Sequence, residues 1–219
     1  MNKALFFPAI KRRLVYSRHN AYRRYRKEIR EDCQGRCVYC DIHENELQYN
    51  AFSEQEIMTL DHFRPQDTYG HLKNDPTNLV YSCKTCNELK GCAWPAWGTS
   101  STIFNGRGFL DPFITDLHLY FNITDNGKFI PLMPPAEFII KQLKLNREII
   151  RRVREKRIKI YEVYHLSILY IKQALTQIDE ILNKPLTLAE NERLLVYRDK
   201  LWREYEELLE KPIPDFTLR

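Results

Sequence analysis

The sequence predicts an α+β fold in which two strands and one helix form a small core that paired cysteines staple together. Three observations support this prediction. Cys37 and Cys40 are spaced Cys-x-x-Cys, and Cys83 and Cys86 repeat that spacing. Strand-like runs lie between the two pairs, and long helical patterns follow residue 135. A basic helix is expected before the core, and an antiparallel helical hairpin after it.

The overall composition excludes a membrane protein and does not identify a ligand. Against 29 acidic residues stand 34 lysines and arginines, an excess of +5 that is too small to indicate a polyanionic partner. Pro8 interrupts the short apolar run at the N-terminus, so a signal-peptide core is missing. No apolar stretch approaches the roughly 20 residues of a membrane-spanning helix. We therefore expect a cytoplasmic protein without membrane contact.

Basic residues gather near the N-terminus, where residues 3–30 contain a single acidic residue, Glu28. Phosphate is a natural partner for such a stretch, and Arg23 and Arg24 are candidate contacts to a nucleic-acid backbone. A solvated helix face explains the same pattern equally well. The segment 15–32 is predicted to be helical. Its interleaved tyrosines can stack on bases or pack onto a core, and we favour packing. They are Tyr16, Tyr22 and Tyr25.

The two cysteine pairs supply four soft ligands, which suits tetrahedral Zn²⁺. Four thiolates close the coordination sphere, so this zinc is expected to be structural and catalysis must lie elsewhere. Buried apolar thiols or disulfides are the alternatives, and a reducing cytoplasm argues against disulfides. Cys33 and Cys92 have no partner at this spacing and are expected to be ordinary thiols.

Asp61 and His62 stand together at the end of the predicted strand MTLDHF, directly before a polar loop of residues 64–77. Asp61 can bind a hard cation such as Mg²⁺, and His62, neutral near pH 7, can take a proton from water. An isolated Asp-His pair is more often a hydrogen-bonded structural pair. The neighbouring cysteines and asparagines favour the functional interpretation here.

Further candidate site residues follow from the helix expected over residues 83–90. Adjacent helical positions diverge by roughly 100°, so Cys86 can face zinc while Asn87 faces the strand of His62. Lys90 lies near Asn87 and is a candidate phosphate contact. Asn78 stands where the loop returns to the core. Its side-chain carbonyl can accept a proton from one ring nitrogen of His62 and leave the other free as base.

The C-terminal part is predicted to be mostly helical. HLYFNI and KFIPL flank Asp125-Asn126-Gly127, which predicts a β-hairpin. Asn146 can cap a long helix that reaches about residue 182, and Thr187 with Glu190 forms a capping box for the last helix. Such a helical hairpin completes the core, dimerises or docks on another protein. The predicted domains are a basic segment 1–32, a core 33–112, a linker with hairpin 113–135 and a helical region 136–219.

The segments CVYC, TLDHFRP and TNLVYSCKTCNELKG together resemble the HNH endonucleases that carry a cysteine zinc knuckle, over about residues 33–112. The resemblance implies a ββα-metal, treble-clef-like core with the four cysteines as zinc ligands. Asp61 and Asn87 would be ligands of a catalytic Mg²⁺ or Mn²⁺, with His62 as general base and Asn78 as its orienting partner. Phosphodiester hydrolysis is implied, with DNA favoured and RNA possible. Gln66 stands where the family has a basic residue.

The tail, through FLDPF, LYFNITDNGKFIPL and KQLKLNREIIRRVR, is similar to HNH subunits of Septu-type antiphage systems. This resemblance implies a defence function and an ATPase partner of the AAA or ABC type. The alternative is a zinc-stabilised nucleic-acid-binding module with a vestigial active site. Because all four active positions are filled, the sequence favours an enzyme. A second basic cluster, residues 147–159, is another candidate path for a nucleic-acid backbone.

Overall fold

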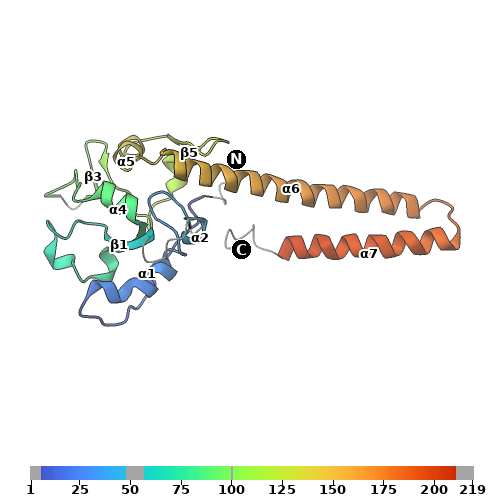
Figure 1. The fold of residues 1–219 in the computed structure, drawn as a ribbon, viewed down its shortest axis with the longest axis horizontal. Coiled ribbons are helices and arrows are strands. Elements are labelled where there is room, and N and C mark those ends of the chain that lie inside the picture. Colours follow the sequence, from blue (N-terminus) through green and yellow to red (C-terminus); the bar gives the residue numbers. More distant parts are fainter. Residues whose placement is uncertain (1–5, 48–56, 100, 211–219) are drawn as a thin grey trace. The chain divides into compact units, whose positions relative to one another are not determined.

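The structure, a computed structural model, describes residues 6–47, 57–99 and 101–210. Its internal contacts divide the chain into two units, residues 1–156 and 157–219, and each unit is described by itself. Helices are combined with small antiparallel sheets of two strands each (Figure 1). This mixture of helices and small sheets confirms the predicted α+β class. The predicted domain boundaries stay a prediction.

The centre of the first unit is a hairpin of two strands followed by a helix. Strand β1 (Met58–His62) pairs antiparallel with β2 (Leu79–Cys83), and His62 stands opposite Leu79. Every residue of β2 is buried. Helix α4 (Lys84–Lys90) begins directly after β2, where Cys83 accepts a hydrogen bond from the backbone N–H of Cys86. This is the predicted order, and it places Asp61 and His62 at the loop end of β1.

The N-terminal helix is shorter than predicted. A 3₁₀ turn, η2 (Tyr22–Tyr25), leads into α1 (Arg26–Asp32), whereas residues 15–21 are not helical. The physical reason is that side chains of the later residues take the backbone donors of this stretch. The N–H of Ser17 donates to Glu28 and that of His19 to the hydroxyl of Tyr25, so a helical ladder has no advantage there.

Short elements complete the first unit. Helix α2 (Glu44–Leu47) follows α1, and the loop between β1 and β2 contains the 3₁₀ turns η4 (Gly70–Leu72) and η5 (Pro76–Asn78). Strands β3 (Ile103–Phe104) and β4 (Arg107–Gly108) form a small hairpin, and η6 (Leu117–Leu119) follows it. The β3–β4 hairpin is a separate two-stranded sheet, so none of these elements extends the β1–β2 sheet.

The predicted hairpin around Asn126-Gly127 is present as β5 (Phe121–Ile123) and β6 (Phe129–Pro131). Gly127 has a φ of +75°, and a Cβ atom there would lie 2.2 Å from the backbone oxygen of Arg151, so only glycine fits. Asn146 does not have the capping role that we predicted. Its side chain instead accepts from the N–H of Phe129 at 2.7 Å and donates to the oxygen of Phe129 at 2.9 Å.

Helices dominate the C-terminal part. Helix α5 (Ala136–Gln142) precedes the long α6 (Glu148–Leu182), and α7 (Leu188–Glu210) returns antiparallel to it (Figure 1). The predicted capping box is present, because Thr187 and Glu190 exchange hydrogen bonds. In the second unit the two helices bury a common apolar cluster, formed by Ile171, Leu175, Ile178 and Leu201. Within the described ranges, no helix is both long and apolar enough to cross a bilayer.

Candidate active site and metal centre

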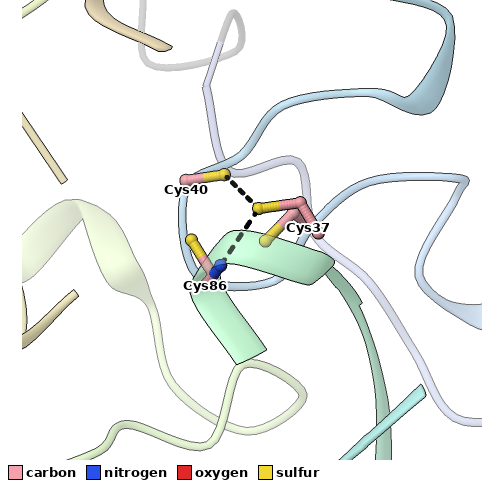
Figure 2. A group of neighbouring side chains, drawn as sticks. Cys37, Cys40 and Cys86 are labelled. Atoms are coloured by element: carbon pink, nitrogen blue, oxygen red, sulfur yellow. Dashed lines mark hydrogen bonds between the residues drawn. The ribbon is translucent and has the colours of Figure 1, made fainter. Parts of the chain in front are cut away.

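The four cysteines of the two Cys-x-x-Cys pairs meet in one buried cluster. Their sulfur atoms all lie within 4.8 Å of one another. Cys37 and Cys40 come from the turn between α1 and α2, Cys83 ends β2, and Cys86 lies in the first turn of α4. Figure 2 shows the side chains of Cys37, Cys40 and Cys86 turned toward one another. Four soft donors in a closed, buried cluster fit the tetrahedral site of a structural zinc ion.

The buried thiols of this cluster shift one another's pKa values. Burial raises the pKa of Cys37 well above its ordinary value, whereas hydrogen bonds from the neighbouring thiols hold the pKa of Cys83 well below it. Four thiolates within 4.8 Å of one another would repel strongly unless a cation compensated their charge. The donor set therefore fits a metal ion better than it fits four ordinary buried thiols.

Arg147, just before α6, is a neighbour of the cysteine cluster that the sequence analysis missed. Its guanidinium nitrogen Nη2 donates to the sulfur of Cys83 at 3.5 Å and to that of Cys86 at 3.4 Å. Burial alone would lower the pKa of Arg147, but the nearby thiolates outweigh it and raise the pKa. A zinc ion held by four thiolates would carry two net negative charges, which the guanidinium of Arg147 would partly offset.

Asp61 is buried at the end of β1 and has two partners. The hydroxyl of Tyr39 donates to its carboxylate at 2.5 Å, and the ammonium of Lys90 lies 3.1 and 3.2 Å from its two oxygens. Burial raises the pKa of Asp61 from its ordinary value, although Lys90 and Tyr39 act in the opposite direction. A carboxylate offers about four lone-pair sites, so these contacts leave room for a cation on the same group.

Lys90 has a different place from the one expected. Its side chain is 1% exposed, and its ammonium also donates to the backbone oxygen of His62 at 2.8 Å. The ion pair with Asp61 and this bond to the end of β1 leave the ammonium no path to a phosphate. These contacts replace the nucleic-acid contact that we expected for Lys90. They instead tie α4 to the strand that carries Asp61 and His62.

The ring of His62 is held in one tautomer by the loop. Its Nε2 lies 2.9 Å from the backbone oxygen of Lys73. A carbonyl oxygen can only accept, so Nε2 carries the hydrogen and, in the neutral ring, Nδ1 keeps its lone pair. The ring of Tyr22 meets that of His62 edge-on, with centroids 4.7 Å apart. The site thus contains an oriented imidazole with one free nitrogen.

Asn78 closes the loop rather than touching the histidine ring. Its side-chain oxygen accepts from the N–H of Arg64 at 2.9 Å, and its nitrogen donates to the oxygen of Arg64 at 3.0 Å. Its own backbone oxygen accepts from the N–H of Phe63 at 2.8 Å. The bond that we expected between Asn78 and the ring of His62 is replaced by these contacts. Asn78 holds the residues that follow His62, and the oxygen of Lys73 orients the ring.

The remaining candidate residues lie on helical elements. Asn87 is half-buried on α4 one position after Cys86, and its side chain has no hydrogen-bond partner within residues 6–47, 57–99 and 101–210. Its amide oxygen is therefore available as a metal ligand. Arg23 and Arg24 are exposed on η2, which suits a contact to a polyanion. Cys33 is buried outside the four-sulfur cluster, and Cys92 is exposed.

Comparison with known proteins connects this geometry to one family. Residues 37–92 match the HNH endonuclease family. Over 61 residues the chain is 39% identical to the Septu protein PtuB from Bacillus thuringiensis, an alignment that spans 28% of this chain and 21% of that relative. No solved structure matches the chain significantly. The resemblance to HNH endonucleases expected from the sequence is thereby confirmed for residues 37–92, referred to below as the HNH segment.

Two residues that act on the HNH segment were not found from the sequence. Tyr39 lies between the cysteines of the first pair, and its bond to Asp61 joins the metal centre to the candidate active site. Arg147 lies outside the HNH segment altogether, 61 residues from Cys86. Local spacing gives no signal for either contact, because each depends on the packing of separate segments.

Proposed function

We propose that this chain is a metal-dependent endonuclease of the HNH type, which hydrolyses phosphodiester bonds of nucleic acids. The observation that supports this most directly is the state of His62. Its Nε2 is engaged by the oxygen of Lys73, so the lone pair of Nδ1 is available to accept a proton. An imidazole held in this way can serve as a general base near neutral pH.

In the proposed reaction His62 takes a proton from water through Nδ1, and the water oxygen attacks phosphorus in line with the leaving 3′ oxygen. Asn78 keeps the loop closed, so that the oxygen of Lys73 remains at Nε2. Asp61 and Asn87 would hold Mg²⁺ or Mn²⁺ through oxygen, which both cations prefer. When bound, that ion supplies Lewis-acid stabilisation of the charge that develops on the phosphoryl group.

The fold that supports this site is proposed to be a ββα-metal, treble-clef-like core made of β1, β2 and α4. In this proposal Zn²⁺ is held by Cys37, Cys40, Cys83 and Cys86 and has a structural role, because four thiolates leave no open position for water or substrate. Cys86, which would hold the zinc, lies in the first turn of α4, and Asn87 lies in the same turn. One metal centre therefore positions a ligand of the other.

The biological setting is proposed from the similarity to the Septu protein PtuB. We infer a cytoplasmic nuclease of antiphage defence that works beside an ATPase partner of the AAA or ABC type, with DNA as the favoured substrate and RNA as the second. The α6–α7 hairpin is a candidate docking element for that partner. Exposed apolar side chains on it support this role, among them Val163, Leu166 and Leu169.

The test is cleavage of duplex DNA, single-stranded DNA and tRNA by the purified chain, with and without Mg²⁺ or Mn²⁺. His62→Ala should lower the rate by about 100-fold or more, the contribution of a general base. His71→Ala is the matched control, because His71 is an exposed histidine of the same loop. If the chain cleaves nothing, alone or with a Septu-type ATPase, it is instead a nucleic-acid-binding module with a vestigial site.

A further inference from the structure

A hollow of about 520 Å³ lies next to the proposed active site. It is lined by Tyr22, Arg23, Arg26, Thr59 and Leu60. Tyr22 is shared between this hollow and the active site, because its ring also contacts that of His62. The backbone N–H of Tyr22 donates to the side-chain oxygen of Asn74 at 3.0 Å, which fastens η2 to the loop that orients His62. The hollow is therefore built onto the active-site loop.

The three tyrosines of the basic segment have different environments. Tyr25 is buried, and the hydroxyl of Tyr16 donates to Asp32 at 2.6 Å. These two pack as the sequence favours. Tyr22 is half-buried and lines the hollow instead. Of the three rings, Tyr22 is thus the one placed to accept a flat ligand beside His62.

Among the described residues that line the hollow, both charged side chains are arginines. Arg23 is exposed, with its guanidinium 5.8 Å from the ring centre of Tyr22. Arg26 is held in place by a bond to the backbone oxygen of Met58 at 3.0 Å and by the ring of Tyr81. That hydrogen bond uses one of the five guanidinium N–H groups of Arg26. None of the five lining residues that the structure describes is acidic, so these five place no carboxylate against an anion.

We propose that this hollow is a subsite for one unpaired nucleotide next to the scissile phosphate, with the base on Tyr22 and its phosphate on Arg23 and Arg26. An aromatic ring beside arginines is the usual platform for single strands, because every base offers a π-face and the backbone offers charge. In a duplex both faces of a base are already stacked. The inference rests on the proposed nuclease and names its substrate class as single-stranded nucleic acid.

The test measures binding, so that it does not depend on cleavage. Fluorescence anisotropy is recorded for the full-length chain with labelled single-stranded DNA, single-stranded RNA and duplex DNA, without added divalent cation. Tyr22→Leu should weaken single-strand binding by about 5- to 150-fold, the range for one stacked base. Tyr22→Phe keeps the ring and should retain most of the affinity. Tyr170→Leu is the matched control, since that tyrosine is 72% exposed on α6.

The contact between Arg23 and phosphate is measured separately, through the salt dependence of binding. Arg23→Gln should reduce the slope of log affinity against log salt by about 0.7 for single strands, the value of one phosphate contact. Arg203→Gln removes the same charge from an exposed position of α7 and should leave the slope unchanged. Far-UV circular dichroism and zinc content of each variant show that the fold is retained.

The outcomes separate this inference from the proposed function. The inference is overturned if Tyr22→Leu weakens single-strand binding no more than Tyr170→Leu does. It is equally overturned if duplex binds more tightly than single strands, or if no single strand binds at low salt. Cleavage with an unaffected Tyr22→Leu variant would leave the nuclease standing without this subsite. Loss of binding in Tyr22→Leu without cleavage by the wild type would support the subsite in a protein that is not a nuclease.

Discussion

Replacing Lys90 with methionine should destabilise the first unit strongly, although Lys90 is a charged residue with a nearly isosteric replacement. Its side chain is 1% exposed and Asp61 is 5% exposed, so the ion pair between them is buried. Lys90→Met removes the cation and leaves the carboxylate with the hydroxyl of Tyr39 alone. Removing one partner of a buried ion pair costs about 3–5 kcal/mol of unfolding free energy.

A double-mutant cycle shows whether the lost pair is the cause. Asp61→Asn removes the charge but keeps a group that can accept from Tyr39. The double variant, Lys90→Met with Asp61→Asn, should therefore be more stable than the sum of the two single losses by about 1–3 kcal/mol. Urea unfolding followed by the fluorescence of the buried Trp94 gives the free energies. The buried ion pair is not the cause if Lys90→Met lowers the unfolding free energy by less than about 1 kcal/mol at pH 7. The same holds if the losses of Lys90→Met and Asp61→Asn simply add in the double variant.

The pH dependence of the same variant follows from the pKa of Asp61. Burial raises this pKa above its ordinary value of 3.8, and the contribution of Lys90 acts to lower it. Without Lys90 the pKa in the folded state rises further, so the folded state binds a proton that the unfolded state releases. Stability of Lys90→Met should then increase relative to the wild type as pH falls from 7 toward 5. If the difference in unfolding free energy between Lys90→Met and the wild type stays constant over this range, Lys90 is not the group that lowers the pKa of Asp61.

Three further predictions concern the metal centre and the N-terminal segment. Cys83→Ser should lose zinc and unfold the HNH segment, measured by metal content and circular dichroism; a folded, zinc-loaded variant would refute the zinc assignment. Arg147→Leu should weaken zinc retention against a chelator by about 10-fold or more, whereas Arg147→Lys keeps the charge and should lose less. Burial and the bond to Asp32 raise the pKa of Tyr16 to about 12, so its stabilising contribution is complete below pH 10 and is lost as pH rises through 12. Urea midpoints of wild type and Tyr16→Phe should therefore converge between pH 10 and 12, and a constant difference would refute this.

The features that the sequence predicts correctly depend on residues that are close along the chain. The two cysteine pairs, the Asn126-Gly127 turn and the capping box of Thr187 and Glu190 each have a local spacing with a physical meaning. The pairing of β1 with β2 was also predictable. Each strand is an apolar run with a recognisable end, Asp61-His62 for β1 and Cys83 for β2.

The features that were missed join residues that are far apart. Lys90 was expected to contact phosphate because it lies near Asn87 on the helix, yet its charge is compensated by Asp61, 29 residues away. The segment 15–21 was expected to be helical, but side chains of η2 and α1 accept from the backbone donors of His19 and Ser17. Propensity is a weak prior when a distant partner offers a better hydrogen bond.

The paired bonds between Asn78 and Arg64 have a consequence for how this protein can change over generations. A carboxamide, like a peptide group, offers N–H donors and a carbonyl acceptor side by side, and here it pairs with the backbone of Arg64 as a neighbouring strand would. The two ends of the 64–77 loop are thereby joined independently of most of the residues between them. Mutation can then alter exposed side chains of the loop while its two ends, next to His62, stay joined.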